Sequence, residues 1–505
     1  MTPAIENMTP AIDEAIDEAI EEFEVVIIGA GFSGLCMAIH LRRLGCASLV
    51  ILEREADYGG TWRSNTYPGC ACDVPSLMYS FSFEPNPNWS RSFSSQPEIW
   101  AYTRHCFDKY AIGRLVRCNQ GLDRAHYDDA SGRWDLATAT GCRYRASMVV
   151  FATGGLSRPC VPQLPGLQTF GGKVFHSATW DHSYALRDKK VAVIGTGASA
   201  IQFVPQIAPV VAQLDLYQRT PPWVVAKDDR PIGRWQRRLF ARLPWLQKLA
   251  RATVYCVLES RAWVFFSQPR FMAAAAFFAR RHLFSQVADP QLRAKLLPNY
   301  TIGCKRILLS NDYYPALTRP NVHLRTEGIA GIEPTGIRDS QGVLRPVDAI
   351  LFGTGFETQR PVAPGAIIGA GGVDLGQLWK DGMFAYKGTT VSGFPNAFFL
   401  VGPNTGLGHN SILYIIESQV AYVAAAFALL RQRGFAPLTV TAGAQDHYNA
   451  VLQAKMARSV WKTGCKSWYV AANGKNTTLW PGFTFAFRRQ TARFDAQVYV
   501  PPPQV

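Results

Sequence analysis

The stretch EVVIIGAGFSG, residues 24–34, decides the fold. Its first five residues form an apolar run typical of a buried strand, and a helical pattern follows the glycines as far as Leu44. Glycines at this spacing allow a tight turn that brings the backbone and a helix N-terminus close to a pyrophosphate. The stretch therefore predicts a dinucleotide site whose first contacts are Gly29, Gly31, Ser33 and Gly34.

A second apolar run, residues 48–52, ends at Glu53, which lies 19 residues after Gly34. A carboxylate at the end of this strand can accept hydrogen bonds from ribose hydroxyls. It would repel a 2′-phosphate, so the site should prefer an unphosphorylated ribose. We therefore expect FAD at this first βαβ unit.

The architecture recurs at KVAVIGTGASA, residues 190–200. Here the residue 19 positions after Ala200 is Arg219 instead of an acid, and a guanidinium there would pair with a 2′-phosphate. The second unit should therefore bind NADPH in preference to NADH. The predicted contacts of this fingerprint are Gly195, Thr196, Gly197, Ser199, Ala200 and Arg219.

The predicted fold class is α/β, with two Rossmann-like dinucleotide-binding domains, for FAD and NADP, and an inserted helical subdomain. Prolines at 159, 162 and 165 indicate a linker between the two domains, and a basic, helical pattern begins near residue 229. The expected division is an acidic disordered tail at 1–23, an FAD domain at 24–160 and 385–505, an NADP domain at 161–228 and 323–384, and a helical insertion at 229–322.

Composition narrows the class of protein. The chain has 505 residues, 48% of them hydrophobic and 18% charged, which is typical of a globular enzyme of several domains. Its net charge is +15, although eight acidic residues and no Lys or Arg lie within residues 1–24. A basic body can attract phosphorylated cofactors, and no nucleic-acid-binding module is recognisable, so no nucleic-acid partner is expected.

Targeting and metal signals are absent from the sequence. The 11 cysteines show no metal-ligand spacing, and their odd number together with the lack of a signal peptide predicts reduced thiols and a cytoplasmic protein without a metal. The apolar stretch at 262–279 is interrupted at residues 268–270, so no membrane span is expected there. Contact with a membrane surface stays open as the less favoured alternative, and nothing in the sequence indicates an oligomeric state.

Two longer motifs resemble those of a known family. The motif FGGKVFHSATWD, residues 170–181, is similar to the signature of type I Baeyer-Villiger monooxygenases, a branch of the flavin-containing monooxygenases. A second family pattern is GTWRSNTYPGCACD, residues 60–73, and the resemblance runs from about residue 24 to 495. It covers nearly the whole chain.

The resemblance implies roles for individual residues. Arg306, in Gly303-Cys-Lys-Arg, would be catalytic, with Asp73 fixing its orientation. The further implied FAD contacts are Gly60, Thr61, Trp62, Asp73 and Tyr79. The further implied NADP contacts are Thr220, Lys305 and Trp468. The signature residues Phe170, Gly172, His176, Trp180 and Asp181 would form a hinge or clamp between the domains.

The resemblance also implies a reaction. NADPH would reduce FAD, O2 would add to give a C4a-peroxyflavin, and a ketone would become an ester or lactone, with sulfide oxidation as a further activity. The main alternative is a flavin-containing N- or S-monooxygenase. A disulfide reductase would need Cys-x-x-Cys, but only Cys70-Ala-Cys72 is present. A non-enzymatic FAD-binding interaction protein is the remaining alternative.

Overall fold

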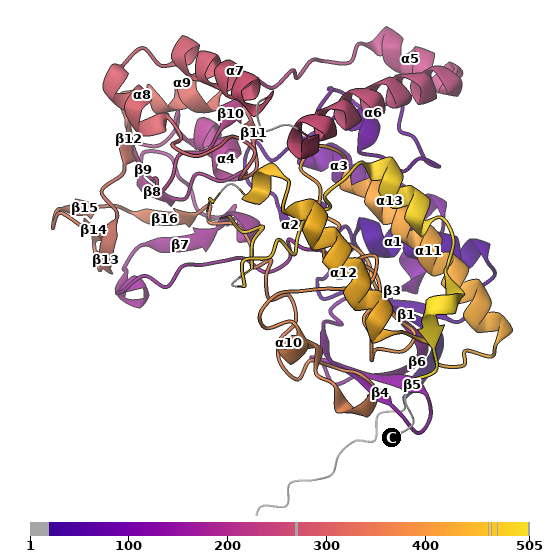
Figure 1. Cartoon of the computed structure of the whole chain (residues 1–505). Helices are drawn as coiled ribbons and strands as arrows, with labels where there is room; N and C mark the ends of the chain where they lie inside the picture. Colours follow the sequence, from indigo (N-terminus) through magenta and orange to yellow (C-terminus); the bar gives the residue numbers. More distant parts are fainter. Residues whose placement is uncertain (1–19, 268–270, 463, 466, 472, 503–505) are drawn as a thin grey trace, which may run out of the picture.

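The computed structural model describes residues 20–267, 271–462, 464–465, 467–471 and 473–502. It forms two large sheets with helices around them and a helical layer along one side (Figure 1). The predicted fold class is confirmed. Most of the predicted acidic tail, residues 1–19, lies outside the described residues.

The first sheet carries the N-terminal fingerprint, and its strand order is β17-β4-β5-β6-β1-β2-β3, with β18 also paired to β6. Strands β1, β2, β3, β6 and β18 run parallel, and β4, β5 and β6 form an antiparallel meander. The bounds are β1 (Glu21–Ile28), β2 (Leu49–Leu52), β3 (Val116–Arg117), β4 (Leu122–Asp128), β5 (Arg133–Thr138), β6 (Arg143–Phe151) and β18 (Ala397–Phe399).

Helices from distant parts of the sequence cover this sheet. They are α1 (Phe32–Arg43), α2 (Thr61–Ser64), α3 (Gln96–Lys109), α10 (Leu375–Leu378), α11 (Ile412–Gln432), α12 (Ala442–Met456) and α13 (Thr484–Thr491). Near the C-terminus, β19 (Thr439–Val440) pairs with β20 (Tyr499–Val500). Helix α11 packs against both α1 and α13, so the C-terminal part of the chain completes the first unit.

The second sheet is parallel throughout and has the order β12-β9-β8-β16-β7. Its first four strands along the chain are β7 (Lys173–His176), β8 (Lys190–Ile194), β9 (Gln213–Tyr217) and β12 (Val322–Arg325).

 Strand β16 spans Ala349–Phe352 and lies between β8 and β7. Helix α4 (Ala200–Ile207) follows β8, and an antiparallel sheet of β13 (Ile329–Glu333), β14 (Gly336–Asp339) and β15 (Leu344–Pro346) lies beside this unit.

The predicted helical insertion contains five helices among the described residues, and they form the layer at the top of Figure 1. They are α5 (Arg234–Arg242), α6 (Pro244–Ser267), α7 (Phe271–Gln286), α8 (Pro290–Leu296) and α9 (Tyr313–Leu317). The segment also returns to the second unit, because β10 (Val224–Val225) pairs in parallel with β11 (Leu308–Leu309). This pairing positions the loop that carries Arg306.

Two element boundaries differ from those expected. Strand β1 begins at Glu21, three residues before the expected start, because residues 21–23 pair with the first half of β6. Strand β17 (Ile367–Ile368) lies in the segment expected to belong to the NADP domain, yet it pairs with β4 of the first sheet. A strand of two residues is too short to show strand periodicity in a sequence, so the pairing of this segment with the first sheet could not be predicted from local sequence.

A continuous apolar core joins the two units, since one cluster of buried side chains includes residues of β1, α1 and α11 together with residues of β8, β9 and α4. Among the described helices, α11 alone has the length and hydropathy to cross a membrane. Its apolar window is 61% buried within the protein, where it contacts α1 and α13. Helix α11 is therefore a core helix of the first unit.

Candidate active site

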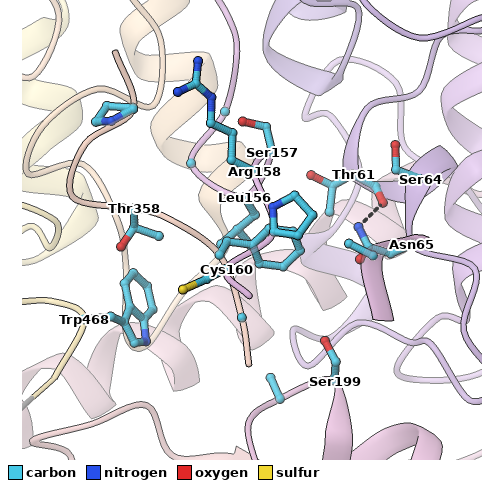
Figure 2. Close-up of a pocket in the computed structure, with 18 of the residues that line it drawn as sticks. Thr61, Ser64, Asn65, Leu156, Ser157, Arg158, Cys160, Ser199, Thr358 and Trp468 are labelled. Atoms are coloured by element: carbon cyan, nitrogen blue, oxygen red, sulfur yellow. Dashed lines mark hydrogen bonds between the residues drawn. The ribbon is translucent and has the colours of Figure 1, made fainter. Parts of the chain in front are cut away.

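A large cavity lies between the two sheets and is lined by residues of both glycine fingerprints. Its volume is about 1830 Å³, whereas pockets for one drug-sized ligand span roughly 300–1,000 Å³. Figure 2 shows Thr61, Ser64 and Asn65 on one side of the cavity and Thr358 and Trp468 on the other. The cavity has room for two dinucleotides and a substrate.

The first fingerprint has no space for side chains at its glycines. Gly29 has φ +104°, and a Cβ there would lie 2.8 Å from the carbonyl oxygen of Ala152. A Cβ at Gly34 would lie 2.0 Å from the carbonyl oxygen of Gly29. The turn therefore leaves the backbone exposed to the cavity at the start of α1, where Ser33 also lines the wall. This geometry fits a pyrophosphate.

Glu53 lies at the end of β2, beside this turn. Its Oε2 accepts a hydrogen bond from the backbone N–H of Ala30 at 2.7 Å, and its Oε1 accepts one from Glu55 at 2.9 Å. The carboxylate is buried, yet it lines the cavity. Its position is the one that a ribose-binding acid requires.

The second family pattern is packed directly against the first fingerprint. A Cβ at Gly60, which has φ +57°, would lie 2.9 Å from the Cα of Gly31. Thr61 and Trp62 then begin α2, and both line the cavity. The indole N–H of Trp62 donates to the hydroxyl of Tyr79 at 3.0 Å, so two of the predicted FAD contacts hold each other in place.

The same pattern also reaches the second unit. The hydroxyl of Tyr67 donates to Oε1 of Gln202 on α4 at 3.0 Å. A Cβ at Gly69 would lie 2.7 Å from the carbonyl oxygen of Gln202. Residues 60–73 therefore connect the two dinucleotide sites, a role that their spacing in the sequence did not indicate.

The second fingerprint repeats the geometry of the first. Gly195 has φ +105°, and its Cβ would lie 2.6 Å from the carbonyl oxygen of Gly353. The hydroxyl of Thr196 donates to the carbonyl oxygen of Thr220 at 3.3 Å, which ties the glycine turn to the segment after β9. The remaining predicted contacts at this turn, Gly197 and Ser199, also line the cavity, whereas Ala200 packs beneath the turn against Gly353.

Two cations face the cavity beside this turn. Arg219 is exposed, and Lys305 is half-buried. Burial and the neighbouring positive charge of Arg219 lower the pKa of Lys305. Neither side chain has a carboxylate partner among the described residues. Two uncompensated cations at the second site match the 2′-phosphate of NADPH.

Arg306 and Asp73 form an ion pair on the cavity wall, although 233 positions separate them in the sequence. Nε of Arg306 donates to Oδ2 of Asp73 at 3.1 Å, and Nη2 donates to the same oxygen. Their side chains are 38% and 25% exposed, and both line the cavity. The guanidinium thus keeps donors free for a ligand while the carboxylate fixes its plane.

The pair keeps its charges over a wide pH range. Burial by itself would raise the pKa of Asp73, but the guanidinium of Arg306 outweighs it, and the pKa lies below its usual value. The carboxylate in turn raises the pKa of Arg306 further. Arg306 is therefore a fixed positive charge and does not exchange protons.

Tyr469, which the sequence did not mark as a site residue, is influenced by the charges of this pair. Tyr469 is buried; burial raises its pKa to about 12, and the charge of Arg306 opposes that rise. Its ring contacts that of Trp468, with centroids 4.4 Å apart, and Trp468 lines the cavity. The only feature of the sequence that could have placed Tyr469 near the site is its position directly after Trp468.

The expectation that all thiols are reduced is wrong for one pair. Cys304 and Cys465 form a disulfide with a Cα–Cα distance of 6.2 Å. It joins the segment of Lys305 and Arg306 to the loop that carries Trp468. The two cysteines are 161 positions apart, so no local sequence spacing predicted the disulfide.

Cys70 and Cys72 are buried free thiols, and burial raises the pKa of Cys70 to about 11. A disulfide reductase needs a reactive thiolate beside the flavin. The environment of these two thiols therefore argues against that alternative.

The five signature residues lie around β7, beside Ala178 and Thr179, which line the cavity. None of the five predicted signature positions lines the cavity in the described part of the chain. His176 ends β7, accepts a hydrogen bond from the backbone N–H of Ala178 at 3.0 Å, and has a pKa lowered by burial. Trp180 packs against Phe175 and Phe203, with ring centroids 5.1 and 5.3 Å away.

The other signature residues pack around the same strand. Asp181 forms an ion pair with Lys173 at 2.6 Å, and this contact lowers the pKa of Asp181. A Cβ at Gly172 would lie 2.4 Å from the carbonyl oxygen of Asp348 and 2.6 Å from the ring of Phe170. These contacts pack β7 and its flanks within the second unit.

Comparisons with known proteins agree with this site. Residues 22–369 match the sequence family described as flavin-binding monooxygenase-like. A Baeyer-Villiger monooxygenase of Pseudomonas aeruginosa is 53% identical over 483 residues, which cover 95% of this chain and 92% of that protein. A Baeyer-Villiger monooxygenase of Streptomyces coelicolor is 46% identical over 489 residues, or 96% of this chain and 93% of that protein.

Solved structures show the same architecture. Cyclohexanone monooxygenase from Rhodococcus sp. Phi1, bound to NADP+, superposes with a TM-score of 0.85 at 25% identity and covers 96% of this chain and 100% of that one. Oxidised steroid monooxygenase bound to NADP gives a TM-score of 0.83 at 28% identity, with coverage of 95% and 100%.

Both glycine turns line one cavity, and the family match covers residues 22–369. The chain therefore belongs to the flavin-binding monooxygenase-like family. Within that family it is a Baeyer-Villiger monooxygenase. It is an enzyme that depends on FAD and NADPH and converts ketones to esters or lactones.

Proposed function

We propose that the enzyme acts on small-molecule ketones, and also on sulfides, with FAD at the first glycine turn and NADPH at the second. When bound, NADPH supplies a hydride and FAD passes the electrons to O2, so that one oxygen atom enters the substrate and the other leaves as water. The ion pair of Arg306 and Asp73 on the wall of the shared cavity is the observation that carries the proposal.

Arg306 has the role of a fixed electrophile. A nucleophilic attack on a ketone carbonyl places negative charge on the carbonyl oxygen, and a guanidinium that stays charged stabilises this oxygen. In a cavity from which water is excluded, such stabilisation is greater than in bulk water. Asp73 holds the guanidinium plane.

The other predicted site residues bind and orient the cofactors. On the FAD side, Glu53 receives a ribose hydroxyl, while Trp62 and Tyr79 form the wall near Asp73. On the NADP side, Arg219 and Lys305 receive the 2′-phosphate, and Thr220 and Trp468 lie along the same cavity. We assign the signature residues around His176 to the hinge between the units, and we place the enzyme in the cytoplasm.

The test uses the purified enzyme with FAD, NADPH and O2, and a panel of ketones and sulfides, with products identified by mass spectrometry. We expect esters or lactones from ketones, and we expect Arg306→Ala to oxidise NADPH while releasing H2O2 in place of product. Arg91→Ala is the matched control, because Arg91 pairs with Asp229 at 2.9 Å but does not line the cavity.

Product identity decides between the two candidate activities. Sulfoxides without any ester from the whole ketone panel would favour the alternative of an N- or S-monooxygenase. An Arg306→Ala variant that forms product as efficiently as the control would remove Arg306 from the mechanism.

A further inference from the structure

The outer face of α5 and α6 exposes large apolar side chains to solvent. Trp235 is 75% exposed, Trp245 61% and Leu249 59%. Leu243, Val257, Trp263 and Phe271 are exposed beside them, and the rings of Trp263 and Phe271 lie 5.0 Å apart, which joins α6 to α7. We call these seven side chains the outer apolar face. Single exposed apolar residues are ordinary, but this many large ones on two adjoining helices and the start of a third mark an interaction site.

Helical spacing places Trp245 and Leu249 of this face on one side of α6. Exposed residues recur on α6 at intervals of three or four: Trp245, Leu249, Ala252 and Cys256. Residues at such intervals lie on one side of an α-helix. Helices α5 and α6 lie side by side at the edge of the molecule in Figure 1, and they contact each other.

The opposite side of α6 is already occupied by the protein. Nη1 of Arg251 donates to the carbonyl oxygens of Leu77 and Ser80 at 2.6 and 3.0 Å. Nε2 of Gln247 donates to the carbonyl oxygen of Asn86 at 2.6 Å. These contacts attach α6 to the first unit, so the outer apolar face is not needed to hold the helix in place.

The charged side chains on α5, α6 and α7 are, apart from one buried acid, all positive. Residues 230–288 contain 11 Lys and Arg residues and a single acidic residue, Glu259. Glu259 is buried and accepts hydrogen bonds from Asn410 and Thr484, so it does not offset the surface charge. The exposed cations on α5 and α6 are Arg234, Arg238, Arg242, Lys248 and Arg261.

We propose that the outer apolar face of α5 and α6, together with these cations, docks the enzyme on the surface of an anionic phospholipid bilayer. Tryptophan and aliphatic side chains enter the boundary between headgroups and acyl chains, while Arg and Lys bind lipid phosphates. Each cation near an anionic membrane contributes about fivefold to the binding constant. Among the described residues, neither α5, α6 nor α7 is a candidate membrane span, so the contact is with the surface.

The same charges disfavour other occupants. A second copy of the chain would bring an identical set of cations against this face, with no exposed acid among residues 230–288 to compensate them. Nucleic acid would satisfy the cations but would leave aliphatic side chains such as Leu249 and Val257 facing a polar backbone. A bilayer satisfies both kinds of side chain.

The experiment is vesicle flotation of the full chain with FAD bound, at physiological salt. One set of vesicles contains phosphatidylglycerol and phosphatidylcholine, and the other contains phosphatidylcholine alone. We expect the enzyme to float with the anionic vesicles at least about tenfold more than with the neutral ones, and to be released by high salt.

Two double variants separate the two parts of the surface. Trp235→Ser with Trp245→Ser removes apolar side chains, and Arg238→Ser with Arg242→Ser removes two cations. Each should lower binding to the anionic vesicles by about tenfold or more. The control is Arg124→Ser with Arg143→Ser, which removes two exposed cations of β4 and β6 and should change binding little.

FAD content and turnover of a water-soluble ketone show whether each variant is folded. Three results would overturn the proposal: no flotation with either vesicle, equal flotation with both, or equal loss in the control variant. Sedimentation that reveals a dimer abolished by the tryptophan variant, without vesicle binding, would assign the face to a second copy. Binding to a DNA duplex but not to vesicles would assign it to nucleic acid.

Discussion

Replacing Arg219 tests the preference of the enzyme for NADPH over NADH. Arg219 and Lys305 line the cavity beside the second glycine turn without carboxylate partners among the described residues. A hydrogen bond to a charged group contributes about 1.5–3 kcal/mol. Because Arg219 is exposed, we take the lower end of that range, about 1.5 kcal/mol, which corresponds to roughly tenfold. Arg219→Ala should therefore lower kcat/KM for NADPH about tenfold.

NADH lacks the 2′-phosphate, so its kcat/KM should change by less than about twofold in the same variant. The assay is steady-state oxidation of each coenzyme with a saturating ketone. Arg54→Ala is the matched control, since Arg54 is a cation of the same cavity on the FAD side and should affect both coenzymes equally. An unchanged ratio of NADPH to NADH efficiency in Arg219→Ala would refute the assignment.

The pH dependence adds a second readout. Lys305 would hold the 2′-phosphate only while it is protonated, and burial together with Arg219 lowers its pKa. Affinity for NADPH should therefore fall as the pH rises through this lowered pKa, at a lower pH than for an ordinary lysine. Arg219→Ala removes the repulsion and raises the pKa of Lys305, so the fall should move to higher pH. A fall at the same pH in both proteins would contradict the coupling.

Three further changes test the rest of the site. Asp73→Asn should leave Arg306 charged but poorly oriented, so the amount of ester formed per NADPH should fall about tenfold or more. Ester and released H2O2 are measured together, and an unchanged ester yield would exclude the positioning role of Asp73. Reduction of the Cys304–Cys465 disulfide by dithiothreitol should lower the ester formed per NADPH while FAD stays bound. The yield of the Cys465→Ser variant should not respond to the reductant, and an equal response in the variant would contradict the role of the disulfide. Gly60→Ala should weaken FAD binding at least about tenfold, because its Cβ would lie 2.9 Å from the first fingerprint; unchanged FAD fluorescence titration would count against the contact.

The sequence alone determined the parts of this protein that depend on near neighbours. The glycine turns at Gly29 and Gly195, the strands before them and the residues at 53 and 219 all lie within about 30 positions of one another in each unit. Strand, turn and helix signals act over such distances, because they arise from backbone conformation and local hydrophobic spacing. The two dinucleotide units and the predicted difference in their coenzymes follow from these local patterns.

Contacts between distant segments were decided by the tertiary structure. The Asp73–Arg306 pair, 233 positions apart, was expected only from a family resemblance, and the Cys304–Cys465 disulfide was not expected at all. The pairing of β17 with β4 and the position of Tyr469 beside Arg306 also lacked a local signal. Such contacts depend on how the packed sheets and helices fill space around a shared core, and no pattern within a short window of sequence records that geometry.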